Sequence, residues 1–70
     1  PLIHNTVLNF GVPPSRMTPQ EKEQVIQALE HQGVFSTKGS VGQAAKELNI
    51  SEPTVYRYLR RIRTRDDSDV

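Results

Sequence analysis

The stretch VGQAAKELNISEPTVYRYLRRIR, residues 41–63, decides the fold of this 70-residue chain. It contains two segments in which apolar residues recur at helical spacing, separated by a short break at residues 49–51. In the first segment, Ala44 and Ala45 have small side chains, which allow another helix to approach closely. Asn49 tolerates the left-handed backbone conformation that a tight turn requires. The stretch therefore predicts two helices that cross at an angle around a tight turn.

The second of these helices, expected over about residues 52–63, is amphipathic. Val55, Leu59 and Ile62 fall within roughly 60° of one another at 100° per residue, so we expect them to form a buried stripe. Four arginines share the segment with this stripe: Arg57, Arg60, Arg61 and Arg63. Seven basic residues against two acidic ones give residues 38–65 a net charge of +5, although the whole chain carries only +1. This concentration of positive charge indicates a polyanionic partner.

A further helix is predicted upstream, in the stretch TPQEKEQVIQALEHQG. Thr18 is placed to be its N-cap, and Glu21 occupies the capping-box position three residues later. Gly33 is the expected stop signal. The apolar stripe of this helix consists of Val25, Ile26 and Leu29. These signals predict a third core helix that packs beside the first two.

The N-terminal stretch PLIHNTVLNF has apolar spacing compatible with one or two helical turns, and Gly11, Pro13 and Pro14 then prevent its continuation. We interpret residues 1–17 as the end of a preceding element with a linker. Residues 18–65 are then the folded domain, and the acidic residues 66–70 a disordered tail. The expected fold is all-α, a small three-helix helix-turn-helix domain with an N-terminal extension.

The pattern from Val41 to Arg60 is that of a helix-turn-helix, a motif whose second helix enters the major groove of double-stranded DNA. An outward side chain such as Arg57 then reaches base edges, whereas groups at the helix start and on its flanks meet phosphates. The residues expected to contact bases are Glu52, Pro53, Tyr56, Arg57 and Arg60. Those expected to contact phosphates are Ser51, Thr54, Arg61, Arg63 and Lys38. Because one such motif reads only a half-site, we expect a homodimer or higher oligomer in the full-length protein.

The stretch KGSVGQAAKELNISEPTVYRYLRRIR resembles the C-terminal helix-turn-helix domain of YheO-like bacterial transcriptional regulators. The resemblance continues upstream through PPSRMTPQEKEQVIQALEHQGVFSTKGSV, so it covers roughly residues 10–63. That family usually has Gly where this chain has Asn49, and KGAV where this chain has KGSV. In the family, a PAS-like sensor domain precedes the linker and the motif. The resemblance implies a transcriptional regulator whose sensor domain is missing here, and the start at Pro1 agrees with a piece of a longer protein.

Two other functions are compatible with the same residues. One is the DNA-binding domain of a site-specific recombinase or transposase. The other is a helical protein-interaction module, in which the arginines pair with an acidic partner or with the acidic tail. The salt dependence of binding to duplex DNA distinguishes this protein-interaction module from a DNA-binding domain. When a protein neutralises phosphates, its affinity for DNA falls steeply as the salt concentration rises.

Several classes are not expected. The chain has no cysteine, and His4 and His31 lack neighbours at metal-ligand spacing, so neither a metal nor a cofactor is predicted. The sequence shows neither a phosphate-binding glycine loop nor a Ser-His-Asp set, and a helical domain of this size has little room for an active-site pocket, so we do not expect an enzyme. No apolar run approaches the roughly 20 residues that span a bilayer, and no signal peptide is evident. We expect a cytoplasmic protein.

Overall fold

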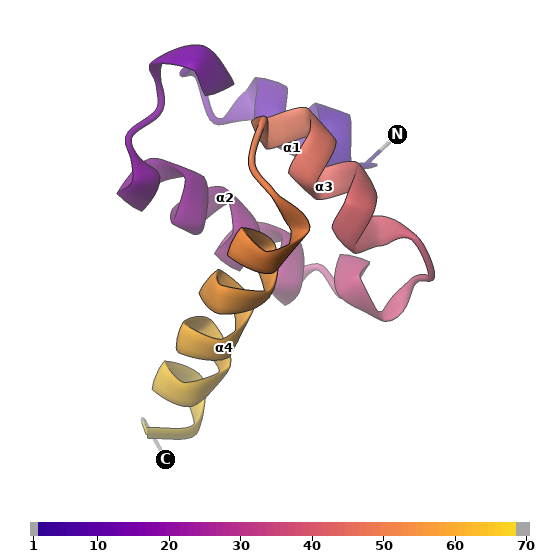
Figure 1. Cartoon of the computed structure of the whole chain (residues 1–70), viewed down its shortest axis with the longest axis vertical. Helices are drawn as coiled ribbons and strands as arrows, with labels where there is room; N and C mark the ends of the chain where they lie inside the picture. Colours follow the sequence, from indigo (N-terminus) through magenta and orange to yellow (C-terminus); the bar gives the residue numbers. More distant parts are fainter. Residues whose placement is uncertain (1, 69–70) are drawn as a thin grey trace.

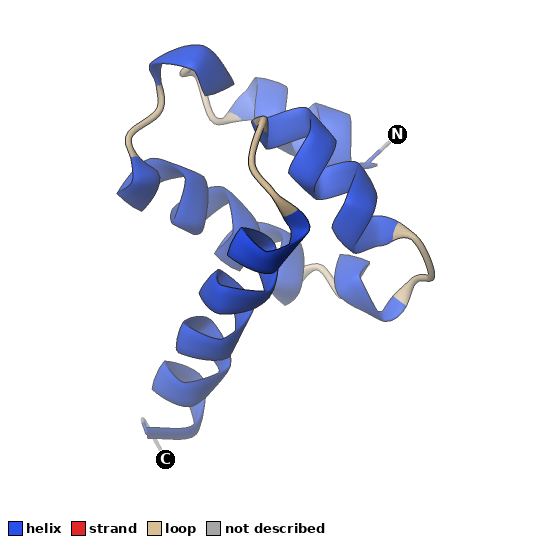
Figure 2. Ribbon diagram, viewed as in Figure 1, coloured by secondary structure: helices blue, strands red, loops and turns tan. Residues whose placement is uncertain are grey.

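The computed structural model describes residues 2–68, and every regular element in that range is helical (Figure 2). Its α-helices are α1 (Leu2–Asn9), α2 (Pro19–His31), α3 (Ser40–Leu48) and α4 (Glu52–Ser68). Two single-turn 3-10 helices lie in the connections before and after α2: η1 (Pro14–Arg16) and η2 (Val34–Ser36). The prediction of an all-α domain is confirmed.

The hydrophobic core lies where α2, α3 and α4 meet, and α1 packs against α2 and α3 (Figure 1). Its largest fully buried side chains come from α2, α3 and α4: Val25, Ile26, Leu29, Leu48, Val55, Leu59 and Ile62. Both apolar stripes expected from the sequence are therefore buried. Each such side chain contributes about 1.5–3 kcal/mol on burial, so this cluster is the main source of stability in a chain without disulfides.

The start and the end of α2 follow the predicted signals. The Thr18 hydroxyl accepts a hydrogen bond from the Glu21 N–H at 3.1 Å, and the Glu21 carboxylate accepts one from the Thr18 N–H at 2.8 Å. This capping box satisfies N–H groups that a first helical turn otherwise leaves without partners. After α2, Gly33 adopts a left-handed φ of 78°, which turns the chain into η2.

The N-terminal helix α1 belongs to the same core, although the sequence placed residues 1–17 in a preceding element and linker. Ile3 and Val7, one turn apart, are 5% and 4% exposed and face α2 and α3. Met17 is buried in the same cluster. The chain reverses at Gly11, whose φ of 87° is left-handed, so the segment folds back over the domain. The structure therefore adds α1 and Met17 to the core that residues 18–65 were expected to form.

The C-terminal helix α4 also differs from its expected extent, since it continues to Ser68, beyond the predicted end at about residue 63. Asp66 and Asp67, expected in a disordered tail over residues 66–70, are helical. One polar contact supports the last turns: Asp66 Oδ2 lies 3.7 Å from His31 Nε2 at the end of α2. Residues 66–68 are therefore part of α4 and not of a disordered tail, and residues 69–70 lie outside the described range.

Candidate nucleic-acid interface

The break between α3 and α4 is the tight turn that the sequence predicts. Asn49 adopts φ 55° and ψ 47°, the only left-handed conformation of a non-glycine residue among those that the structure describes. Its N–H donates to the Lys46 carbonyl at 3.3 Å, and the Ile50 N–H donates to the Ala45 carbonyl at 3.0 Å. These two bonds close the C-terminus of α3 in a Schellman motif. They also set the angle at which the chain enters α4.

The first turn of α4 is held by local hydroxyl bonds. Ser51 Oγ accepts a hydrogen bond from the Thr54 N–H at 3.2 Å and lies 2.9 Å from Thr54 Oγ1. Ser51 is thus the N-cap, as expected, and Val55 in the following turn is fully buried. Both hydroxyls lie at the helix N-terminus, where backbone N–H groups and the helix dipole favour negative charge.

The outward face of α4 carries the side chains that the sequence assigned to base contact. Those residues are all exposed: Glu52, Pro53, Tyr56, Arg57 and Arg60. Tyr56 is 53% exposed, which is unusual for an aromatic side chain of a small domain. Glu52 leans on α3, because a Cβ at Gly42 would lie only 3.2 Å from its Oε2 atom. The N-terminal half of α4 thus presents a continuous exposed surface beside the turn.

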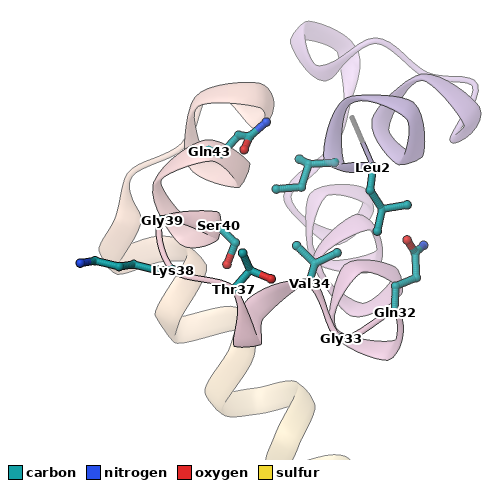
Figure 3. Close-up of a pocket in the computed structure, with 10 residues that line it drawn as sticks. Leu2, Gln32, Gly33, Val34, Thr37, Lys38, Gly39, Ser40 and Gln43 are labelled. Atoms are coloured by element: carbon teal, nitrogen blue, oxygen red, sulfur yellow. The ribbon is translucent and has the colours of Figure 1, made fainter.

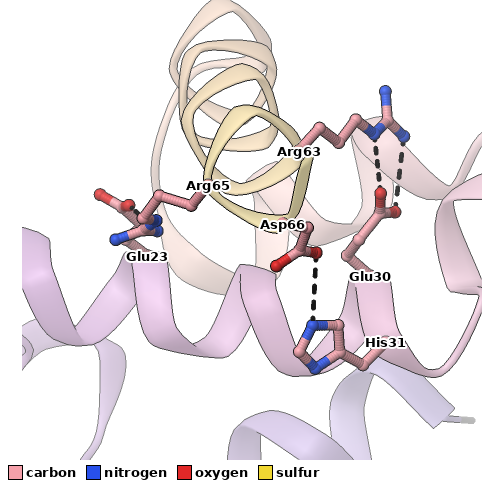
Figure 4. A network of polar contacts seen from close by, with 6 residues as sticks. All are labelled: Glu23, Glu30, His31, Arg63, Arg65 and Asp66. Atoms are coloured by element: carbon pink, nitrogen blue, oxygen red, sulfur yellow. Dashed lines mark hydrogen bonds and ion pairs between the residues drawn. The ribbon is translucent and has the colours of Figure 1, made fainter. Parts of the chain in front are cut away.

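The arginines in the C-terminal half of α4 are paired with α2. Arg61 Nη2 donates to Glu23 Oε1 and Arg65 Nη2 donates to Glu23 Oε2, both at 2.7 Å. Arg63 donates to Glu30 through Nε at 2.7 Å and Nη2 at 3.4 Å. Figure 4 shows Arg63 and Arg65 on either side of α4, reaching down to these carboxylates on α2. The bond to Glu30 raises the pKa of the Arg63 guanidinium above its usual range.

Other basic side chains make no such pair. Within residues 2–68, Arg57, Arg60 and Lys38 form no ion pair with a carboxylate, and all three are exposed. The Arg57 guanidinium lies 5.8 Å from the ring centre of Tyr58, and the Arg61 guanidinium lies 5.3 Å from the same ring. These distances permit cation–π attraction. Arg16, Lys22 and Lys46 also form no ion pair within this range, so three of the six unpaired basic side chains lie on α4 or just before α3.

Sequence reasoning missed the role of Glu23 and Glu30. The two residues are seven apart, so they share one face of α2, and Arg61 and Arg65 are four apart on α4. These spacings are compatible with ion pairs between two helices, but they do not show which helix is the partner. In the structure, α2 packs against α4, so the two glutamates meet the arginines of α4.

An open cleft of about 330 Å³ lies beside the start of α3, away from the arginines of α4. Figure 3 shows Leu2 and Val34 on one side of it and the hydroxyl residues Thr37 and Ser40 on the other, while the Lys38 side chain points away. Ser40 is 4% exposed, and its Oγ has no hydrogen-bond partner among the described residues. The cleft brings together no set of nucleophile, base and acid.

Within residues 2–68, no three side chains of the His, Cys, Asp or Glu types are grouped as a metal site would require. None of the helices in this range combines the length and the apolar character needed to cross a membrane.

Comparison with known proteins agrees with this geometry. A family model described as "HTH domain" matches residues 1–60, so the chain belongs to this family of helix-turn-helix domains. Among individual proteins, it is similar to "Uncharacterized protein YheO" of Escherichia coli K12 and to the protein of the same name in Shigella flexneri. Each is 37% identical over 46 residues, which cover 66% of this chain and 19% of the relative. No solved structure matches the chain.

The match also bears on the N-terminal segment. The family model begins at residue 1, so it includes α1, which the structure packs into the core. The chain spans about a fifth of the length of the relatives that it matches. The resemblance to YheO-like proteins that the sequence suggested is confirmed.

Proposed function

We propose that this chain is the sequence-specific DNA-binding domain of a bacterial transcriptional regulator, with α4 placed in the major groove. The observation that carries the proposal is the outward face of α4, where Arg57 and Arg60 are exposed and have no carboxylate partner within the described residues. An α-helix fits the major groove, and arginine is the side chain that most often reads guanine there. Membership in the helix-turn-helix family supports the same orientation.

The proposed base-reading residues are those on the exposed first turns of α4: Glu52, Pro53, Tyr56, Arg57 and Arg60. The proposed phosphate contacts flank them. Ser51 and Thr54 lie at the N-terminus of α4, and Lys38 precedes α3, the helix that crosses the backbone in this motif. Arg61 and Arg63, which the sequence also assigned to phosphates, already bind carboxylates of α2.

A regulator of this kind requires two further parts, both of which belong to the proposal. The stretch that matches this chain covers only 19% of each relative, which leaves room for a sensor domain ahead of the DNA-binding domain. A single helix-turn-helix recognises a short half-site, so the longer protein binds as a homodimer or higher oligomer. The same DNA face would also serve a recombinase or transposase, and the attached domain distinguishes these from a regulator.

The test begins with selection of a preferred duplex from a random pool, followed by binding measurements on that duplex and on random duplexes. We expect Arg57→Ala to weaken binding to the selected duplex by about 1–3 kcal/mol and to relax the preference at one base pair. Arg16→Ala is the matched control. Arg16 is exposed in η1, so its replacement removes the same charge from a site outside α3 and α4.

Three outcomes separate the alternatives. A larger loss on the selected duplex than on random ones supports base reading by Arg57. An equal loss on both shows that Arg57 contacts only phosphate. A wild-type chain that binds no duplex at low salt refutes the proposal and favours a protein-interaction module.

A further inference from the structure

The three arginines in the C-terminal half of α4 are held by two carboxylates that are less exposed than the arginines themselves. The side chains of Glu23 and Glu30 are 15% and 20% exposed, whereas those of Arg61, Arg63 and Arg65 are 55–59% exposed. Glu23 accepts one arginine at each of its two oxygens. The guanidinium groups of Arg63 and Arg65 lie over α2 (Figure 4), and that of Arg61 also contacts Glu23. An approaching phosphate therefore competes with a carboxylate that is already in hydrogen-bonding contact.

The last of these arginines lies far along α4 from the end that enters the groove. At a rise of about 1.5 Å per residue, Arg65 is roughly 12 Å beyond Arg57 along the helix axis, too far for base edges near the start of α4. Arg61 and Arg63 are closer to that end, but their guanidinium groups are held on the side that faces α2. Phosphate is therefore the DNA group that all three arginines would meet. Phosphate contacts add affinity for every duplex and carry no sequence information of their own.

We infer that Glu23 and Glu30 limit the sequence-independent part of DNA binding by holding Arg61, Arg63 and Arg65 on α2. The inference rests on the proposed function. It assigns the two glutamates a role in selectivity, because a regulator must find its site among a large excess of random ones. A weak affinity for random duplexes leaves more of the protein free to occupy the correct site. Arg57 and Arg60 on α4 and Lys38 before α3 then remain available to DNA.

A purely structural role is the competing explanation, in which the pairs only fasten α4 to α2. Exposed ion pairs contribute little to stability, and removal of one carboxylate would then lower the melting temperature slightly without changing DNA binding. The two explanations therefore predict different affinities for random duplexes once a glutamate is replaced.

The experiment compares Glu23→Gln, Glu30→Gln and Glu21→Gln by titration against a random duplex over a range of salt concentrations. Glu21→Gln is the matched control, because it removes the same charge from α2. Glu21 forms no ion pair among the described residues, so no arginine is released. Glutamine can also take the place of Glu21 in the capping box. Relative to this control, Glu23→Gln frees two arginines and should tighten binding about 2- to 25-fold, whereas Glu30→Gln frees one and should tighten it about 1.4- to 5-fold. The salt slope should steepen by roughly 1 for each freed arginine that reaches a phosphate.

A second arm separates specific release of an arginine from a general change in charge. Arg61→Gln should weaken binding to the random duplex more in the Glu23→Gln background than in the wild type, because only there is Arg61 released from its carboxylate. Equal effects of Arg61→Gln in both backgrounds, or equal affinities of the three glutamine variants, would overturn the inference while the proposed function stands. Failure of the wild-type chain to bind any duplex would instead refute the proposed function.

Discussion

The capping box of α2 gives the sharpest test of how local contacts stabilise this domain. Thr18→Ala removes the hydroxyl that accepts the 3.1 Å hydrogen bond from the Glu21 N–H. It leaves the 2.8 Å bond from the Thr18 N–H to the Glu21 carboxylate possible, because that donor is backbone. Both groups are exposed, so water replaces the lost partner and only part of the bond energy is lost. The expected cost is about 1 kcal/mol, the usual value for an N-cap.

In a domain of this size, a loss of about 1 kcal/mol lowers the melting temperature by roughly 4–8 °C. Thermal unfolding followed by far-ultraviolet circular dichroism measures this shift. Thr18→Ser is the matched control, because it retains the hydroxyl. Ser and Thr differ as N-caps by roughly a few tenths of a kcal/mol, so this variant should melt within a degree or two of the wild type. Below the melting transition, DNA affinity should be the same in all three proteins, since Thr18 lies outside α3 and α4. If Thr18→Ala melts with the wild type, or if the serine variant falls as far as the alanine variant, the hydroxyl does not stabilise α2.

Substitutions at three further positions test the turn, the core and the buried hydroxyl by the same melting measurement. Asn49→Ala should cost about 1 kcal/mol because alanine tolerates the left-handed conformation poorly, and Asn49→Gly should melt near the wild type; the reverse order would contradict a left-handed turn. Ile62→Ala, at a fully buried position, should cost about 2–5 kcal/mol against about 0.5–1.5 kcal/mol for Ile62→Val, and equal small losses would show that α4 is not packed as described. Ser40→Ala should leave stability unchanged or raise it, because the hydroxyl it removes has no partner among the described residues, and a clear loss would reveal one.

The elements that sequence predicted correctly are those specified within a few residues of one another. Thr18 and Glu21 cap a helix whether or not the rest of the domain is present, and Asn49 adopts its turn conformation for reasons that lie in its own side chain. The apolar stripes are likewise local patterns, and burial of Val55 and Ile62 follows from their periodicity. Local signals of this kind were enough to give the fold class and the position of the turn.

The features that sequence did not give depend on contacts between segments far apart in the chain. Nothing local to α1 shows that Ile3 and Val7 pack against α2 and α3, because a short helix followed by two prolines is equally compatible with a linker. The pairing of Arg63 with Glu30 spans 33 residues and exists only because α2 and α4 pack together. The sequence predicts a phosphate contact for Arg63, and that stays a prediction. The structure adds the Glu30 carboxylate as its neighbour within the chain.

The length of α4 connects these observations. A helix that ended at the predicted point would lack Arg65, and Glu23 would then pair with Arg61 alone. Because α4 continues past that point, the second oxygen of Glu23 also finds a partner, and Asp66 comes within 3.7 Å of His31 at the end of α2. The added turns therefore extend the contact with α2. In this arrangement, the exposed side chains in the two halves of one helix have different neighbours. Arg57 and Arg60 in the first half have no carboxylate partner within residues 2–68, whereas the arginines of the second half pair with α2.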